Sequence, residues 1–416
     1  MIRELVLAIG PLTLAWAAVV YRLPVLWRSA ETPGLRAHWF AHLALAVALA
    51  FLFAPFYLAF DAVVGVANLA RLLAHASVLI SAWCVQTYFA YLALPRDRAR
   101  ATSTRGGVLL LSALLLLGLF FHLANVGEDA IDFTGHFASA PFVLEYRLIF
   151  LAYLGWSMVI LITLARRYAP LARARPALFL GLHLLALAGW VALAYVIHEG
   201  GWAVSRRLNL PYPVPQPEFW KEVLVAVSIG LLLIGATLPA WGPRAGVPAM
   251  YEWATRYMAC RRLYPLWRDL CIGVPDVALV PPTPMIFDAL AVRGMELRLT
   301  RRVIEIRDGR LALRTSVPPG VAENTRRQCR DARLSVHQEQ PTVEAACLAA
   351  ALEARKLGWY PTSPDVMPGA PGARDLGGEV AQLLRLAEAY RRSPIVKAVR
   401  TAVRRNETAQ SLSALA

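Results

Sequence analysis

Long apolar runs separated by short polar connections fill the first 241 residues of the chain. Each run holds about 20 residues, and a helix of that length crosses a hydrocarbon core roughly 30 Å thick. The runs predict seven membrane-spanning helices, at about residues 4–21, 38–58, 62–93, 107–125, 142–165, 176–198 and 220–241. The pattern therefore predicts an all-α fold in which residues 1–241 form a seven-span transmembrane bundle.

Residues 242–416 lack runs of this length and place their apolar residues at helical spacing instead. The spacing predicts helices over residues 251–271, 342–357, 377–391 and 394–405. The segment 293–315 admits two interpretations. Its Asp308-Gly309 pair is typical of a hairpin turn, whereas the spacing of Val303, Ile306 and Arg310 favours a helix. We expect residues 242–416 to form a separate, mostly helical domain.

The composition supports this division. The chain is 57% hydrophobic and 17% charged, with a mean hydropathy of +0.48, whereas ordinary soluble domains are about 25% charged. These values exclude an ordinary soluble protein, a disordered chain and a disulfide scaffold. These composition values do not indicate any particular enzymatic reaction.

Arginine residues gather in alternate connections between the predicted spans. The arginine-rich connections are 22–36, 96–105 and 166–175, and the connection 126–141 on the other side is acidic. The positive-inside rule then places the N-terminus outside and residues 242–416 in the cytoplasm, as in a multi-pass plasma-membrane protein. The same rule, together with attraction of a cytoplasmic domain to anionic lipid headgroups, accounts for the net charge of +15. Because no clustered basic stripe is present, we expect no nucleic-acid partner.

No familiar catalytic or metal-binding signature is present. The five cysteines form no C-x-x-C pair, and a nucleophile elbow, a phosphate-binding loop and a dinucleotide fingerprint are all missing. His38 and His42 have a chelating i, i+4 spacing but no carboxylate between them to act as a base. We therefore expect no metal and no cofactor. An intramembrane enzyme built from scattered residues such as His122, Asp129 and His198 remains an alternative.

Polar and ionisable residues cluster in the outer halves of the predicted spans, where they are costly unless they face a protein interior or a cavity. If a span begins at residue 62, Arg71 lies about 14 Å and His75 about 20 Å into the membrane. With Asn68 they share one helical face. The candidate ligand-binding residues are Asp61, Asn68, Arg71, His75, His122, Glu145, Arg147, His198 and Glu199. They indicate either an outward-facing cavity for a small polar or anionic ligand, with Arg71 as its deep cation, or a structural ion-pair network.

Three segments of the C-terminal part resemble a known family. They are the run LYPLWRDL at 263–270, the run RRVIEIRDGRLAL at 301–313 and the alanine-rich stretch from Thr342. The chain is similar to an actinobacterial family of seven-span membrane proteins with a C-terminal cytoplasmic domain of unknown function, whose members usually carry a transporter label. The resemblance implies that 293–315 is helical. It implies no substrate and no catalytic residue.

Three functions fit these observations. The first is a sensor or regulator that binds a small polar ligand in the outward cavity and relays the change to the cytoplasmic domain and a protein partner. Arg301, Arg302, Glu305 and Asp308 would then form a docking surface, or else a solvated helical face. The second is a small-molecule transporter, which needs polar residues that continue inward along the same spans. The third is an intramembrane enzyme. The sequence favours the first and does not identify the ligand, the partner or the oligomeric state.

Overall fold

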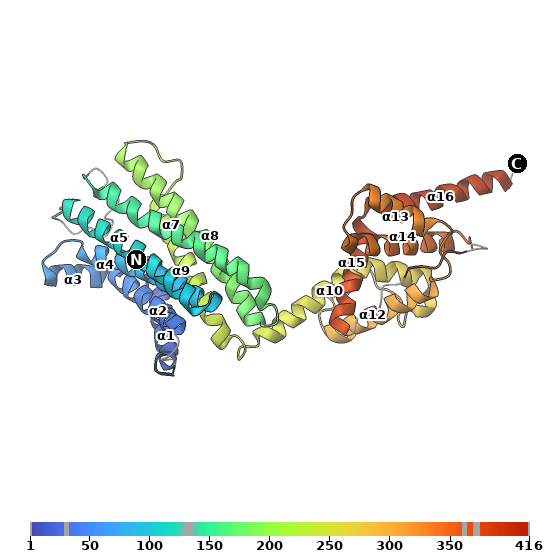
Figure 1. Cartoon of the computed structure of the whole chain (residues 1–416), viewed down its shortest axis with the longest axis horizontal. Coiled ribbons are helices and arrows are strands. Elements are labelled where there is room, and N and C mark those ends of the chain that lie inside the picture. The colour runs from blue at the N-terminus through green and yellow to red at the C-terminus, as the bar shows by residue number, and fades with distance from the viewer. Residues whose placement is uncertain are drawn as a thin grey trace. The chain divides into compact units, whose positions relative to one another are not determined.

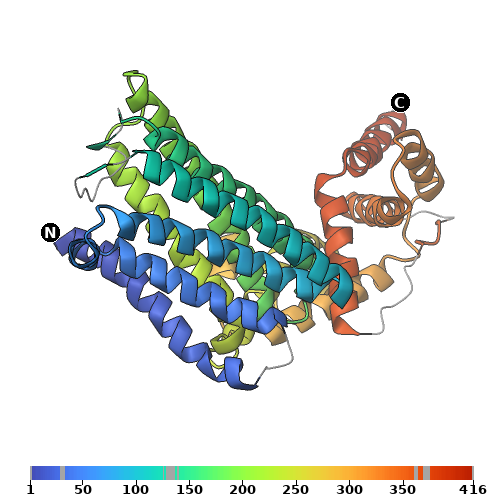
Figure 2. The ribbon, with the colours of Figure 1, turned by 60° about the vertical axis from the view of Figure 1, so that its left-hand side comes forward.

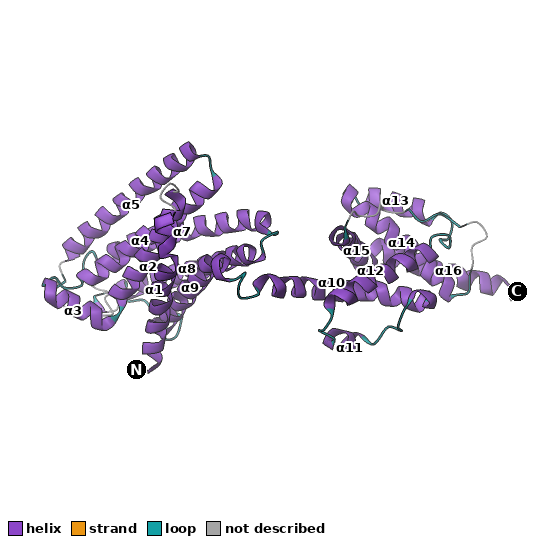
Figure 3. Cartoon of the chain, turned by 90° about the horizontal axis from the view of Figure 1, so that it is seen from below, coloured by secondary structure: helices purple, strands orange, loops and turns teal. Residues whose placement is uncertain are grey.

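The chain forms two compact helical units. The computed structural model describes residues 2–28, 33–124, 126–127, 136–137, 140–359, 364–368 and 375–414. These residues divide into the units Met1–Pro248 and Ala249–Ala416, and both consist of helices (Figure 1, Figure 3). Within the described residues, the β pairing is one isolated bridge between Val317 and Asp365. The prediction of an all-α fold is confirmed.

The first unit is a bundle of long helices that lie lengthwise beside one another (Figure 2). Its helices are α1 (Ile2–Arg28), α2 (Pro33–Leu52), α3 (Ala54–Val64), α4 (Leu69–Ala93), α5 (Arg96–Ala124), α7 (Val143–Tyr168), α8 (Pro176–Arg207) and α9 (Pro217–Trp241). A short 3-10 turn, η1 (Ala169–Ala172), extends α7. The strongest packing joins α2 to α4 and α8 to both α7 and α9.

Six of these helices, α2, α4, α5, α7, α8 and α9, are long and apolar enough to cross a membrane. The chain is therefore a polytopic membrane protein whose helices suit a lipid bilayer. In the searched part of α1 the apolar segment is the shorter Leu12–Pro24. The seventh span and the orientation of the bundle stay predictions. Residues 128–135 of the acidic connection, Asp129 among them, lie outside the described residues.

The third predicted span, 62–93, is wrong at its start. The helix α3 continues through residues 62–64 and ends at Gly65, which has a φ of 73° and donates its N–H to the carbonyl of Asp61 at 2.8 Å. Glycine adopts this left-handed conformation at little cost, so it ends helices readily. A new helix, α4, begins at Leu69. Arg71 therefore lies in the first turn of α4 and not within one continuous helix that begins at residue 62.

Two glycines bring α8 and α9 into close contact. A Cβ atom on Gly181 would lie 2.6 Å from the carbonyl oxygen of Gly235, and one on Gly235 would lie 2.9 Å from the carbonyl oxygen of Gly181. Real Cβ atoms do not approach oxygen this closely. Small residues at such a contact let two helix backbones pack tightly in a membrane, where the hydrophobic effect does not drive association.

The second unit packs around an alanine-rich helix. Its elements are α10 (Val247–Gly273), η2 (Pro275–Val277), α11 (Met285–Leu290), α12 (Met295–Ala312), α13 (Val321–Asp331), α14 (Val336–Lys356), α15 (Leu376–Arg392) and α16 (Pro394–Ala414). Residues 342–354 of α14 are buried, and α13, α15 and α16 pack against it. Alanine leaves room for this close approach on every side of the helix.

The four helices predicted in this unit are all present, and segment 293–315 is helical, as the resemblance implied. The hairpin interpretation of Asp308-Gly309 is wrong, because both residues lie inside α12. The sequence reading missed α11 and α13. Its interpretation of Arg301, Arg302, Glu305 and Asp308 was wrong for two of the four. Asp308 is exposed, but Arg302 and Glu305 are each 3% exposed, and both are bonded within the unit. They form neither a docking surface nor a solvated face.

Candidate functional site

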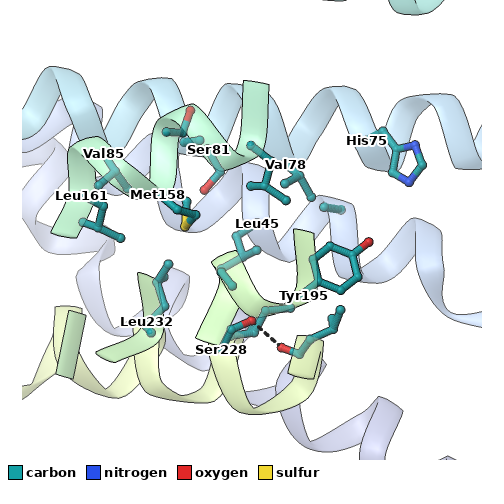
Figure 4. A pocket seen from close by; sticks show the side chains of 18 of the residues that line it. Leu45, His75, Val78, Ser81, Val85, Met158, Leu161, Tyr195, Ser228 and Leu232 are labelled. Atoms are coloured by element: carbon teal, nitrogen blue, oxygen red, sulfur yellow. Dashed lines mark hydrogen bonds between the residues drawn. The ribbon is translucent and has the colours of Figure 1, made fainter. Parts of the chain in front are cut away.

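A cavity of about 270 Å³ lies within the first unit, between α2, α4, α7, α8 and α9. Figure 4 shows His75 and Tyr195 toward one end, and Val85, Leu161 and Leu232 toward the other. The polar end lies near the start of α4, α7 and α9, which the predicted orientation places at the outer face. Three of the predicted ligand-binding residues, Arg71, His75 and Arg147, line the cavity.

His75 joins α4 to α7 at the polar end. Its Nε2 atom lies 3.4 Å from Nη1 of Arg147, and its Nδ1 atom lies 2.7 Å from the hydroxyl oxygen of Tyr146. A guanidinium group only donates hydrogen bonds, so Nε2 accepts and Nδ1 carries the proton that is donated to Tyr146. The ring also stacks on Phe150, with the ring centres 4.1 Å apart. This arrangement fixes a neutral His75 in one orientation.

Arg147 and Glu199 form a buried ion pair between α7 and α8. Glu199 is fully buried and Arg147 is 5% exposed. The pair is incompletely satisfied, because Nε of Arg147 and Oε2 of Glu199 have no hydrogen-bond partner among the described residues. The structure thus pairs two of the predicted ligand-binding residues with each other, and the Arg147 guanidinium lines the cavity.

Asp61 and Asn68 organise the turn between α3 and α4. Oδ1 of Asp61 accepts the backbone N–H of Ala70 at 2.8 Å, and the hydroxyl of Tyr57 donates to Oδ1 of Asn68 at 2.7 Å. Both polar residues are buried. The guanidinium of Arg71 lies 5.5 Å from the ring centre of Tyr57. The turn therefore positions Arg71, while neither Asp61 nor Asn68 lines the cavity.

The other three predicted residues lie elsewhere. His198 is buried, and its ring contacts the hydroxyl of Tyr212 and the carbonyl of Pro217, both at 2.9 Å, so it holds the connection between α8 and α9. His122 and Glu145 are exposed. No group of three or more potential metal ligands occurs among the residues that the structure describes.

The predicted ligand-binding residues omit part of the wall. Lys221 and Glu222 reach the cavity from the first turns of α9, and Tyr195 reaches it from α8. Lys221 and Glu222 are charged residues in an otherwise apolar run, and this pattern could have identified them as candidate ligand-binding residues. The charged side chains that line the cavity are then three cations, Arg71, Arg147 and Lys221, and one carboxylate, Glu222.

A second cavity of about 480 Å³ lies toward the other ends of the same helices and includes His38, His42 and Arg175 in its wall. Nδ1 of His42 lies 2.8 Å from the carbonyl of His38, and the His38 ring packs 4.5 Å from that of Tyr88. The two cavities share six wall residues, which are Leu45, Ser81, Val85, Phe89, Leu161 and Leu232. The wall that they have in common is apolar except for Ser81.

Comparison with known proteins gives one match. The chain matches no curated protein and no solved structure. Over residues 252–393 the chain is similar to a family of unknown function (DUF6545). This match covers all three segments that carry the resemblance, at 263–270, at 301–313 and from Thr342. It gives no support to the seven-span actinobacterial family or to its transporter label.

Proposed function

We propose that the protein is a membrane sensor or regulator whose first unit binds a small anionic ligand with an apolar portion. The observation that carries the proposal is the buried Arg147 guanidinium in the wall of a cavity that is otherwise mainly apolar. Ionisable groups at such positions are costly and are usually retained where they serve a site. The ligand's anionic group would bind at the polar end, beside Arg71, Arg147 and Lys221.

The charge of the wall supports an anion over a cation. Three cationic side chains and one carboxylate face the cavity, while Glu199 lies behind Arg147 and is fully buried. An anion placed there would accept hydrogen bonds from guanidinium groups, which are stronger in a medium of low dielectric constant than in water. A cation would meet mostly like charges.

The rest of the wall supports an amphiphile over a fully polar ligand. Beyond His75 the lining is mainly leucine, valine, phenylalanine and methionine. A polar ligand that filled this part would lose its hydration without gaining hydrogen bonds. A hydrocarbon portion gains free energy there instead. The small polar ligand expected from the sequence is therefore narrowed to one with a charged head and an apolar body.

The covalent connection between the units supports a relay. Residues of α9 from Lys221 to Leu232 line the cavity, and α9 is followed, after residues 242–246, by α10 of the second unit. A ligand that shifts α9 would act directly on the start of α10. We propose that the second unit is cytoplasmic and passes this change to a protein partner.

Thermal unfolding of the full chain in lipid nanodiscs tests the proposal. Dodecyl phosphate and dodecylammonium serve as matched probes of opposite charge. We expect the phosphate alone to raise the unfolding midpoint, because a ligand at about 100 times its Kd stabilises the folded state by about 2.7 kcal/mol. The shift should vanish in Arg71→Gln and persist in Arg105→Gln, which changes an exposed arginine of α5. Equal shifts with both probes, or with both variants, would refute an anion site.

Transport is the second candidate, and the shared wall of the two cavities favours it. A carrier must expose its site to each side in turn, and the two cavities together reach from Lys221 to Arg175. Uptake of radiolabelled dodecyl phosphate into proteoliposomes separates the two functions. Binding without protein-dependent uptake favours the sensor, and uptake that Arg71→Gln abolishes favours the carrier.

A further inference from the structure

The short helix α11 of the second unit buries its charged residue and exposes its apolar residues. Its charged residue, Asp288, is 4% exposed and forms ion pairs with Arg298 and Arg302. Its large apolar residues face away from the unit, and Ile286 is 72% and Phe287 65% exposed. A helix on the surface of a soluble domain normally has the opposite polarity.

Hydrogen bonds hold this arrangement in place. Four side chains of α10 donate to backbone carbonyls at four positions of the segment that contains α11. The donors and acceptors are Tyr264 with Thr283 at 2.7 Å, Arg261 with Met285 at 3.1 Å, Tyr257 with Ala289 at 3.1 Å and Trp253 with Val292 at 3.0 Å. Because the backbone is bonded along its length, α11 cannot simply rotate to bury its apolar side chains.

The exposed apolar residues form one surface, which we call the α11 surface. It consists of Met285, Ile286, Phe287, Leu290 and Val292, each between 45% and 72% exposed. Contiguous exposed apolar surfaces of this kind mark interaction sites.

We propose that the α11 surface inserts into the headgroup region of an anionic lipid bilayer. Two arginines border it: Arg261 donates to the carbonyl of Met285, and the exposed Arg293 follows Val292. The nearby carboxylates of Glu296 and Glu252 share Arg256, at 3.0 and 3.4 Å, and so are fewer than the three arginines. The carboxylate of Asp288 is paired and buried. The border is thus net positive. Apolar side chains flanked by arginine are typical of segments that lie in the interface of anionic membranes.

Chain connectivity favours a bilayer over a soluble partner. Trp253, which bonds to Val292, follows Trp241 at the end of the last candidate span by twelve residues. Such a stretch reaches at most about 43 Å even when fully extended. The bilayer is therefore always at high local concentration for this surface, whereas a second copy or a soluble protein must be found by diffusion.

A fluorescence experiment on the full chain tests the proposal. The five native cysteines are buried, so a cysteine at an exposed position can be labelled selectively with an environment-sensitive dye. Phe287→Cys carries the dye on the α11 surface, and Val336→Cys carries it at an 82% exposed position of the same unit, as the matched control. Ile286→Cys provides a second site if Phe287→Cys unfolds. Each variant is reconstituted into vesicles of phosphatidylcholine and phosphatidylglycerol that contain a brominated lipid.

We expect the brominated lipid to quench the dye at 287 at least threefold more than the dye at 336. We also expect aqueous iodide to quench the dye at 287 less, and the difference to shrink in vesicles of phosphatidylcholine alone. Equal quenching at the two positions by both agents overturns the proposal. So does a dye at 287 that is shielded from iodide but not quenched by brominated lipid, because a protein then covers the surface.

Discussion

Removing one partner of the Arg147–Glu199 ion pair should cost far more than removing both. In Arg147→Met the carboxylate of Glu199, which is fully buried, loses the cation that compensates it. The imidazole of His75 also loses the Nη1 donor at 3.4 Å. Breaking a buried ion pair in this way costs about 3–5 kcal/mol, because one charge is left without a partner in a medium of low dielectric constant.

The double variant Arg147→Met/Glu199→Leu removes the orphaned charge and puts apolar groups in its place. Replacing a whole buried pair with apolar residues is often neutral or stabilising. We therefore expect the double variant to recover most of the loss. The two single variants and the double variant form a thermodynamic cycle, from which we expect a coupling energy of at least about 2 kcal/mol.

Reversible unfolding in mixed micelles of increasing SDS content measures these free energies, with a probe placed in the first unit so that its transition is observed separately from that of the second. Arg105→Met, at an exposed position of α5, is the control and should change stability by less than about 0.5 kcal/mol. A cost below about 1 kcal/mol for Arg147→Met would falsify the reasoning, since it would mean that water already reaches the pair. So would a double variant whose loss equals the sum of the two single losses.

Three further outcomes follow from contacts elsewhere in the chain. Gly181→Val should lower the unfolding free energy by at least about 1–3 kcal/mol, measured in the same SDS titration, because its side chain meets the carbonyl of Gly235. Burial, and then the neighbouring Asp365, raise the pKa of Cys347 to about 12, so its thiol should resist maleimide at pH 8 until the second unit unfolds; labelling of the native protein would contradict this. Burial alone would raise the pKa of Glu353, but hydrogen bonds from Arg404 and Lys356 outweigh it and lower that pKa. The ionised Glu353 carboxylate therefore adds to the free energy of unfolding at neutral pH. This contribution is lost as the pH falls below 4.5 and passes through the lowered pKa of Glu353. Arg404→Ala should flatten that part of the pH–stability curve, and an unchanged curve would count against the pairing.

The sequence predicted the transmembrane helices from run length alone, and that signal failed where two helices share one apolar run. Residues 54–64 are as apolar as a span, so hydropathy could not separate α3 from its neighbours. The break depends on backbone conformation at Gly65 and Asn68, both of which have positive φ. Hydropathy describes the polarity of side chains and does not report backbone dihedral angles.

The candidate site was predicted by residue type but not by pairing. Spacing on one helical face indicated that Arg71 and His75 could share a cavity, and both line it. The partner of Arg147 could not be derived, because it depends on the rotation of α7 relative to α8. The same reason explains the error at Arg302 and Glu305. Their charge suggested water, but Arg302 bonds to Asp288 and to the carbonyl of Cys260, and Glu305 accepts from Trp267.

The apolar wall shared by the two cavities bears on the electrical insulation of the membrane. A hollow that reaches from Lys221 to Arg175 would conduct protons if a continuous file of water filled it. Leu45, Phe89 and Leu161 offer water no hydrogen bonds, and the hydroxyl of Ser81 already donates to the carbonyl of Ala41 at 2.8 Å. An apolar wall of this kind disfavours water and ions. The bundle can therefore hold two cavities with a common wall and still sustain a transmembrane voltage.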